Sequence, residues 1–116
     1  SKAALGSYQV ALAIAQKLAA ADPGNSGLQH DLAVCYKKMG DMQSAQGDSK
    51  AALGSYQVAL AIAQKLAAAD PGNSGLQHDL AVCYNKMGDM QSAQGDSKAA
   101  LGNYQAALAI RQKLGL

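Results

Sequence analysis

Residues 36–59 read YKKMGDMQSAQGDSKAALGSYQVA and decide the fold of this chain. The small residues Gly40, Ala52 and Ala59 alternate with bulky residues at helical spacing, on both sides of a break at Gly47-Asp48. Small residues let two helix backbones approach closely, and larger side chains beside them fill the remaining space. The stretch therefore predicts a hairpin of two antiparallel helices.

The same stretch occurs twice, which makes it a repeating unit. Residues 1–48 and 49–96 are identical except for one pair, Lys37 and Asn85. Residues 97–114 begin a further copy, which departs from the others at Asn103, Ala106 and Arg111. Self-similarity at a fixed period of 48 residues predicts a repeat architecture.

Apolar residues recur at helical spacing within each copy and predict two helices per copy. In the first helix one stripe consists of Leu5, Tyr8, Leu12, Ala15 and Ala19. The expected helices are Lys2–Ala21, Ser26 to the residue before Gly47, Ser49–Ala69, Ser74–Gln94 and Ser97–Leu114. Because the loops between them are short, neighbouring helices must be antiparallel. We therefore expect an all-α protein, an α-solenoid of antiparallel helical hairpins with five helices.

The helix ends carry their own signals. Pro23 cannot continue a helix, so the first helix ends before it. The pattern Ser26-x-x-Gln29 resembles a capping box and predicts Ser26 as the cap of the second helix. Gly47 is the expected glycine after that helix, and Asp48 the expected cap of the next one.

We expect residues 1–116 to form a single domain. It would consist of a half repeat with its closing turn at 1–25, a hairpin at 26–73 and a hairpin at 74–116.

Three glycines, Gly6, Gly54 and Gly102, lie in the middle of predicted helices. Each costs about 1 kcal/mol relative to alanine in a helix. We expect them to allow a close contact with another helix, the alternative being that they face solvent.

Charge and hydropathy exclude several classes of partner. The net charge of +2 and pI of about 8.6 are too weak to indicate nucleic acid or an anionic membrane. The longest apolar run, Val10 to Ala15, is too short to span a membrane. Cys35 and Cys83 occupy equivalent positions on helices too far apart for a disulfide, so we expect reduced, buried thiols. The expected location is the cytoplasm.

The pattern Tyr36-x2-Met39-Gly40-x2-Gln43, followed by Ala52-x3-Tyr56 and Pro71, resembles the tetratricopeptide repeat. It recurs in the next copy as Tyr84, Met87, Gly88, Gln91, Ala100 and Tyr104. The family pattern has Trp, Leu and Tyr where this chain has Tyr36, Met39 and Gln43. The resemblance covers nearly the whole chain.

The repeat is longer than the family's usual length of about 34 residues. About seven of the additional residues precede the tyrosine, at 26–32, and about seven delay Pro71. Seven residues make about two helical turns, so each side chain stays on nearly the same helix face. We expect an extended, TPR-like repeat in which both helices are lengthened.

The resemblance implies a protein–protein interaction scaffold that binds a peptide or protein segment on a concave groove. The helices beginning at Ser26 and Ser74 would line that groove. One stripe of their residues, which we call the groove stripe, consists of His30, Val34, Lys37, Asp41, Ser44, His78, Val82, Asn85, Asp89 and Ser92. The difference between Lys37 and Asn85 lies on this stripe, as selection for a ligand would place it. A neutral or engineered surface change is the alternative.

Neither catalysis nor metal binding is expected. Ser26, His30 and Asp31 suggest a triad, but adjacent helical residues such as His30 and Asp31 do not face each other. His30 and His78 lie on separate helices, which does not suit one zinc ion. We expect a non-enzymatic protein with no cofactor and no metal.

The terminal helices carry the apolar faces of the internal one, at Leu5, Tyr8, Leu12, Leu101, Tyr104 and Leu108. Repeat arrays need polar caps at their ends, and none is visible. We therefore expect self-association through the terminal helices, and the alternative function is a structural, self-assembling repeat module with no ligand. The chain has no initiating Met, so we expect a piece of a longer array or a consensus design; recent duplication and design both fit near-identical copies.

Overall fold

The structure is a computed structural model that describes residues 2–115. It contains five helices, α1 (Lys2–Ala21), α2 (Ser26–Ala45), α3 (Ser49–Ala69), α4 (Ser74–Ala93) and α5 (Ser97–Leu114). Each expected helix is present, and the second and fourth each end one residue earlier than predicted. We call α2 and α4 the A-type helices and α1, α3 and α5 the B-type helices.

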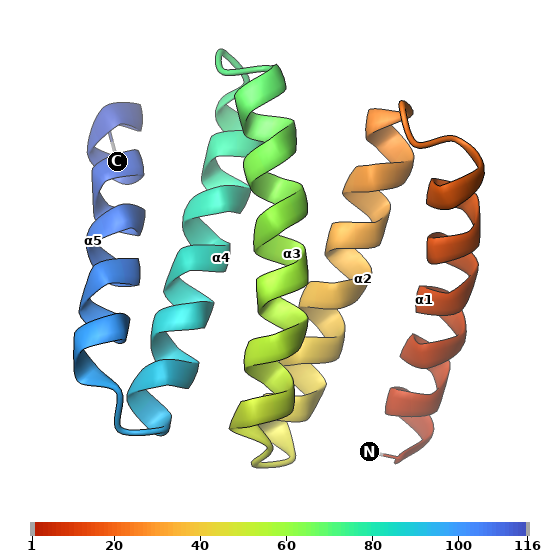
Figure 1. Cartoon of the computed structure of the whole chain (residues 1–116), viewed down its shortest axis with the longest axis horizontal. Coiled ribbons are helices and arrows are strands. Elements are labelled where there is room, and N and C mark those ends of the chain that lie inside the picture. Colours follow the sequence, from red (N-terminus) through yellow and green to blue (C-terminus); the bar gives the residue numbers. More distant parts are fainter. Residues whose placement is uncertain (1, 116) are drawn as a thin grey trace.

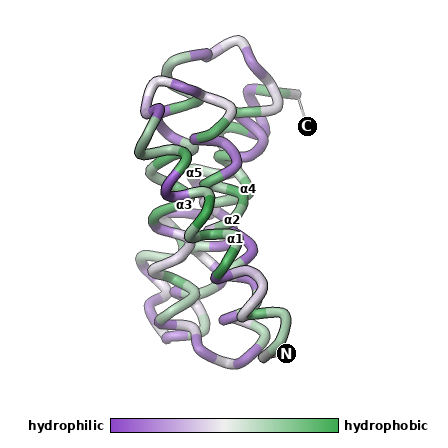
Figure 2. Tube along the Cα trace, turned by 90° about the vertical axis from the view of Figure 1, so that its right-hand side faces the viewer, coloured by the Kyte–Doolittle hydropathy of each residue, from purple (hydrophilic) through white to green (hydrophobic). Residues whose placement is uncertain are grey.

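The helices form an open array (Figure 1). Each helix packs mainly on its neighbours in the chain, so α3 contacts both α2 and α4, whereas α1 packs on α2 and α5 on α4. The molecule measures 35 × 34 × 18 Å, a flat slab rather than a closed bundle. Figure 2 looks onto the α1 edge and shows polar and apolar residues alternating along the helices. This is the expected solenoid of helical hairpins.

The cap of α2 differs from the prediction. Asn25 caps the helix, since its side chain accepts a hydrogen bond from the Leu28 backbone N–H, and Ser26 is already helical. The Gln29 side chain donates to the carbonyl oxygens of Ala19 and Pro23 instead of completing a capping box. Asn and Ser cap helices about equally well, so sequence alone could not choose between neighbours.

The turn between the helices of a hairpin follows its sequence closely. Gly47 has φ +80°, the left-handed conformation that favours glycine, and Asp48 N–H donates to the carbonyl of Gln43. The Asp48 side chain then caps α3 by accepting from the Ala51 N–H. Both expectations for this turn are confirmed.

The core is built where an A-type helix meets the next B-type helix. A Cβ added at Gly40 would lie 2.5 Å from Cε1 of Tyr56, so only glycine fits beneath the ring. Ala52 and Ala59 are fully buried on either side of Tyr56. Gly40, Ala52 and Ala59 thus allow the close approach of two helices that the sequence predicts.

The expectation of close contacts at Gly6, Gly54 and Gly102 is wrong. An added Cβ at any of them would meet no atom of the described residues within 4 Å. Gly54 and Gly102 are exposed and Gly6 is half-buried, and a Cβ at any of these positions would not touch a neighbouring helix.

The two cysteines are free thiols, Cys83 buried and Cys35 half-buried. Within residues 2–115, no helix is long and apolar enough to cross a bilayer.

Candidate functional site

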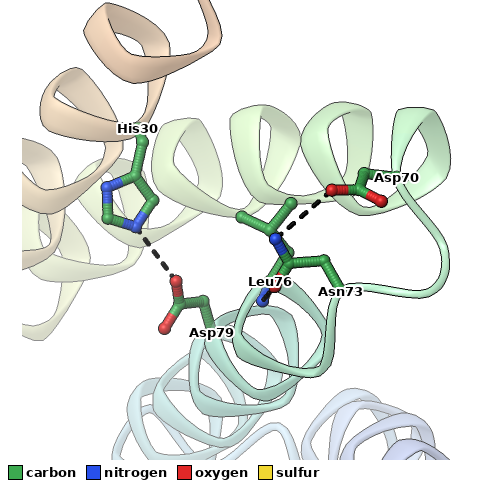
Figure 3. A network of polar contacts seen from close by, with 5 residues as sticks. All are labelled: His30, Asp70, Asn73, Leu76 and Asp79. Carbon is green, nitrogen blue, oxygen red and sulfur yellow. Dashed lines mark hydrogen bonds and ion pairs between the residues drawn. The ribbon is translucent and has the colours of Figure 1, made fainter.

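Two polar pairs join one repeat to the next across the A-type helices. His30 Nε2 on α2 lies 3.1 Å from Asp79 Oδ2 on α4, and Figure 3 shows the imidazole turned toward that carboxylate. Farther along the same helices, Lys86 Nζ on α4 lies 2.7 Å from Asp41 Oδ1 on α2. Both pairs are about two-fifths exposed, so each aligns the helices more than it stabilises them.

Asp41 is the most connected of these groups. Its Oδ1 also accepts a 2.5 Å hydrogen bond from the Tyr56 hydroxyl on α3, and Lys86 Nζ lies 5.6 Å from the centre of the Tyr56 ring. Burial of the phenol, reinforced by the hydrogen bond to the Asp41 carboxylate, raises the pKa of Tyr56. One carboxylate thus ties together three helices from two repeats.

Several clefts lie along the α2–α4 face, and one of them is at the N-terminal ends of α2 and α4, where Ser26, His30 and Leu76 line it. Two others contain more of the groove stripe. The first, which we call the His30 cleft, has walls from α2 and α4 and a floor from α3; it is lined by His30, Ala33, Val34, Lys37, Ala63, Leu66, Leu76, Asp79 and Cys83. The second, the Asp41 cleft, is lined by Asp41, Ser44, Tyr56, Lys86, Asp89 and Met90. The first is largely apolar with a polar rim, and the second is mainly polar.

The structure brings together six of the ten residues of the groove stripe. His30, Val34 and Lys37 line the His30 cleft, and Asp41, Ser44 and Asp89 line the Asp41 cleft. The other four line neither cleft; Val82 and Asn85 are half-buried, and His78 and Ser92 are exposed. In the described part of the chain Lys37 forms no ion pair, so its charge is available to a ligand.

Sequence reasoning missed the two residues of α4 that reach back to α2. Asp79 and Lys86 are seven residues apart and therefore lie two turns apart on one side of the helix. That spacing is visible in the sequence, and it recurs as Asp31 and Lys38 in the previous copy. The spacing alone does not identify a partner, because the sequence does not show how one repeat is shifted along the next.

His30, Asp79 and Cys83 share one cleft and thus place a histidine, a carboxylate and a thiol close together. A catalytic cysteine needs a lowered thiol pKa. Burial instead raises the pKa of Cys83, which keeps the thiol protonated at neutral pH. No group of three or more potential metal ligands occurs among residues 2–115.

The glutamines that replace an aromatic residue of the family pattern, Gln43 and Gln91, each form a hydrogen bond to the next helix. Gln43 Oε1 accepts a 2.6 Å hydrogen bond from the Ser55 hydroxyl, and Gln91 Oε1 accepts one of the same length from Asn103 Nδ2. Polar pairing between the helices of a hairpin here replaces aromatic packing, and Asn103 preserves the bond where the third copy departs from the others.

A family profile described as tetratricopeptide repeat matches the chain twice, over residues 2–47 and 50–95. The chain belongs to the tetratricopeptide repeat family. In this tetratricopeptide repeat protein the two matches are one 48-residue period apart, and each covers a B-type helix with the A-type helix that follows it. Members of the family are generally protein-interaction scaffolds built as solenoids of helical hairpins. No curated protein matches the chain.

The apolar surfaces of the terminal helices differ in part from the expected ones. On α1 the exposed row is Val10, Ile14 and Leu18, which are 62%, 56% and 50% exposed. Leu5, Tyr8 and Leu12 are half-buried because they share a stripe with Ala15 and Ala19, which pack on α2. On α5 the expected Leu101 and Leu108 are indeed exposed, at 56% and 55%, while Tyr104 is half-buried.

Proposed function

We propose that this tetratricopeptide repeat protein is a non-enzymatic scaffold that binds a peptide or protein segment along its α2–α4 face. The observation that carries the proposal is the pair of adjoining clefts whose walls come from two different repeats. A segment lying across both would meet an apolar floor first and a polar site second. That combination suits a peptide with one apolar side chain and polar flanks.

Lys37 and Asn85 are the groups most available for recognition. Lys37 rims the His30 cleft and could meet a ligand carboxylate, and the half-buried Asn85 could bond a peptide backbone through its amide. His30, Asp41, Asp79 and Lys86 already have partners, so a ligand would have to compete for them. The weak net charge favours protein over nucleic acid as the partner. The proposed location is the cytoplasm, where free thiols stay reduced.

An array of peptides probed with the wild-type protein and with the Lys37→Ala, Asn85→Ala double variant tests this function. Loss of one or two polar contacts should weaken bound peptides by about five- to tenfold. Lys50→Ala removes an exposed lysine of α3 that lines neither cleft and is the matched control. Equal binding by the double variant and the wild type would exclude a role for these two residues in the groove.

A structural, self-assembling module is the second candidate, favoured by the exposed apolar rows of α1 and α5. Apolar surface left in water costs about 25 cal/mol per Å², which association would recover. Sedimentation velocity over a hundredfold range of concentration should then show larger species, and Ile14→Lys with Leu108→Lys should abolish them. A monomer at every concentration would rule this candidate out.

A further inference from the structure

The contact between successive A-type helices provides a template for a binding site at the α5 edge. In that contact α4 supplies Asp79 and Lys86, which meet His30 and Asp41 of α2. The residues one period of 48 farther along are His78 and Asp89 of α4. A helix placed beside α4 as α4 lies beside α2 would meet those two residues.

His78 and Asp89 are exposed, and within residues 2–115 neither has an ion-pair partner. Asp89 is nevertheless held in the same way as Asp41. Its Oδ1 accepts a 2.5 Å hydrogen bond from the Tyr104 hydroxyl, just as Asp41 Oδ1 accepts one from Tyr56. The carboxylate is therefore oriented as it is in the preceding repeat, where it also receives the Lys86 ammonium.

The apolar half of the template is present as well. On α3, Leu53 and Leu60 pack into a cluster that includes Met87 of α4 and are half-buried there. Their equivalents on α5 are Leu101 and Leu108, which are more than half exposed. The α5 edge thus offers apolar and charged groups in the arrangement that holds α4 in place.

We infer that the α5 edge, formed by His78, Asp89, Leu101 and Leu108, binds an amphipathic helix with an acidic residue followed seven residues later by a basic one. The acid would meet His78 and the base Asp89, because residues seven apart lie two turns apart on one helix face. Apolar residues placed like Met87 and Met90 of α4, which pack with Leu53 and Leu60 of α3, would cover the leucines. The edge shares Asp89 with the Asp41 cleft, whereas His78, Leu101 and Leu108 line neither cleft. Variants of Leu108 and Lys37 therefore distinguish this proposal from binding along the α2–α4 face.

A folded second copy does not supply such a helix. Asp31 and Lys38 of α2 have the required spacing, but α2 is already packed between α1 and α3. The partner we propose is therefore a helical segment of another protein, recognised by its acid–base spacing.

One residue of the edge opposes binding. Arg111 of α5 stands where α3 has Ala63, which is buried against Leu80 and Cys83 of α4. Arg111 is exposed, and its long side chain can move its charge into water while its methylenes stay on the helix surface. A bound helix must share this space, so we expect modest affinity that improves when Arg111 is shortened.

The probe is a capped synthetic peptide with the sequence of residues 73–95, carrying a fluorophore and titrated against the full chain. Saturable binding is expected, tightened severalfold by Arg111→Ala. Asp89→Asn should weaken it by about two- to fivefold, the range of a partly exposed ion pair. A peptide with Asp79→Lys and Lys86→Asp should bind at least as weakly to the wild-type protein, after its helicity has been matched by circular dichroism.

Asp31→Asn, an exposed carboxylate at the opposite edge, is the matched control and should change nothing. Leu108→Lys should abolish binding. Lys37→Ala should leave it intact, which separates this edge from the groove. If the Arg111→Ala variant fails to saturate, or if binding is unaffected by both Asp89→Asn and Leu108→Lys, the assignment of this edge is wrong.

Discussion

Single glycines have opposite roles in the two helices of a hairpin. Gly40 lies under the Tyr56 ring, whereas Gly54 has no neighbour within 4 Å of an added Cβ among the described residues. Gly40→Ala should lower the free energy of unfolding by about 1–3 kcal/mol, because a buried ring has to move. Gly54→Ala should raise it by about 1 kcal/mol through helix propensity alone. Urea denaturation followed by circular dichroism measures both.

The same substitution in the next repeat provides a replicate. Gly88 lies under Tyr104 with 2.7 Å to an added Cβ, and Gly102 is as unobstructed as Gly54. A destabilising Gly54→Ala would mean that the B-type helix has a neighbour on that side after all.

The Tyr56 phenol makes stability depend on pH in the alkaline range. Burial first, and the hydrogen bond to Asp41 second, raise the pKa of Tyr56 in the folded protein. The unfolded chain then loses this proton at a lower pH, near 10, while the folded chain retains it. The stabilisation is complete below about pH 10 and is lost as the pH rises toward the folded-state pKa. Thermal midpoints between pH 8 and 11 should fall more steeply in the wild type than in Tyr56→Phe; parallel curves would contradict this.

The cysteines should differ in reactivity although their local sequences are nearly the same. Cys83 is buried, and that burial raises the pKa of its thiol, whereas Cys35 is half-buried. Since the thiolate is the reactive form, the single-cysteine variant Cys35→Ala should react with iodoacetamide about tenfold more slowly than Cys83→Ala. Equal rates in the folded state would show that α4 opens as readily as α2, and equal rates in urea are the control.

At the level of elements, the ion pair between Asp41 and Lys86 couples two repeats and can be measured by a double-mutant cycle. Both side chains are partly exposed, so Asp41→Asn and Lys86→Gln should show a coupling of about 0.2–1 kcal/mol that decreases with salt. The matched cycle uses Lys38→Gln and Asp89→Asn, the same residue types at opposite edges of the array. Those two changes should be additive; coupling there equal to that of the first cycle would refute the assignment.

The helices could be predicted because their signals are local. Apolar spacing and the Gly47-Asp48 break each lie within one short stretch of chain, and the period of 48 repeats them in the next copy. The helix bounds predicted from them are correct to a residue or two. The fit of Gly40 under Tyr56 followed from the same pattern. The spacing of residues along a helix does not show how deeply each one is buried, however. For that reason the sequence predicts a contact at Gly54 that the structure does not contain.

The candidate site was only partly predictable because it depends on the offset between repeats. The stripe containing His30 and Asp41 could be read from one helix. Their partners, Asp79 and Lys86, come from a helix more than forty residues away, and identical copies carry the same residues in every register. Only the packing of α4 beside α2 selects which Asp meets which His.

For the whole molecule, burial along the B-type helices follows from the number of neighbours each one has. α1 buries Ala15 and Ala19, toward its C-terminal end, against α2. α5 buries Ala100 and Ala107, nearer its N-terminal end, against α4. α3 has both neighbours and buries the equivalents of both sets together with Tyr56. Stability in such an array is a sum of repeat and interface contributions.

Residues 2–21 and 50–69 have the same sequence, so α1 and α3 compare packing at constant helix propensity. With one neighbour rather than two, α1 should open more often, and its amide protons should exchange at least tenfold faster than those of α3. Segmental isotope labelling distinguishes the two copies by NMR, with exchange at Tyr8 and Tyr56 as the most direct pair. α5, which also has one neighbour, should resemble α1. Equal protection of Tyr8 and Tyr56 would mean that something covers the outer side of α1 in solution. Because dilution separates associated copies, protection that falls on dilution would identify that cover as self-association.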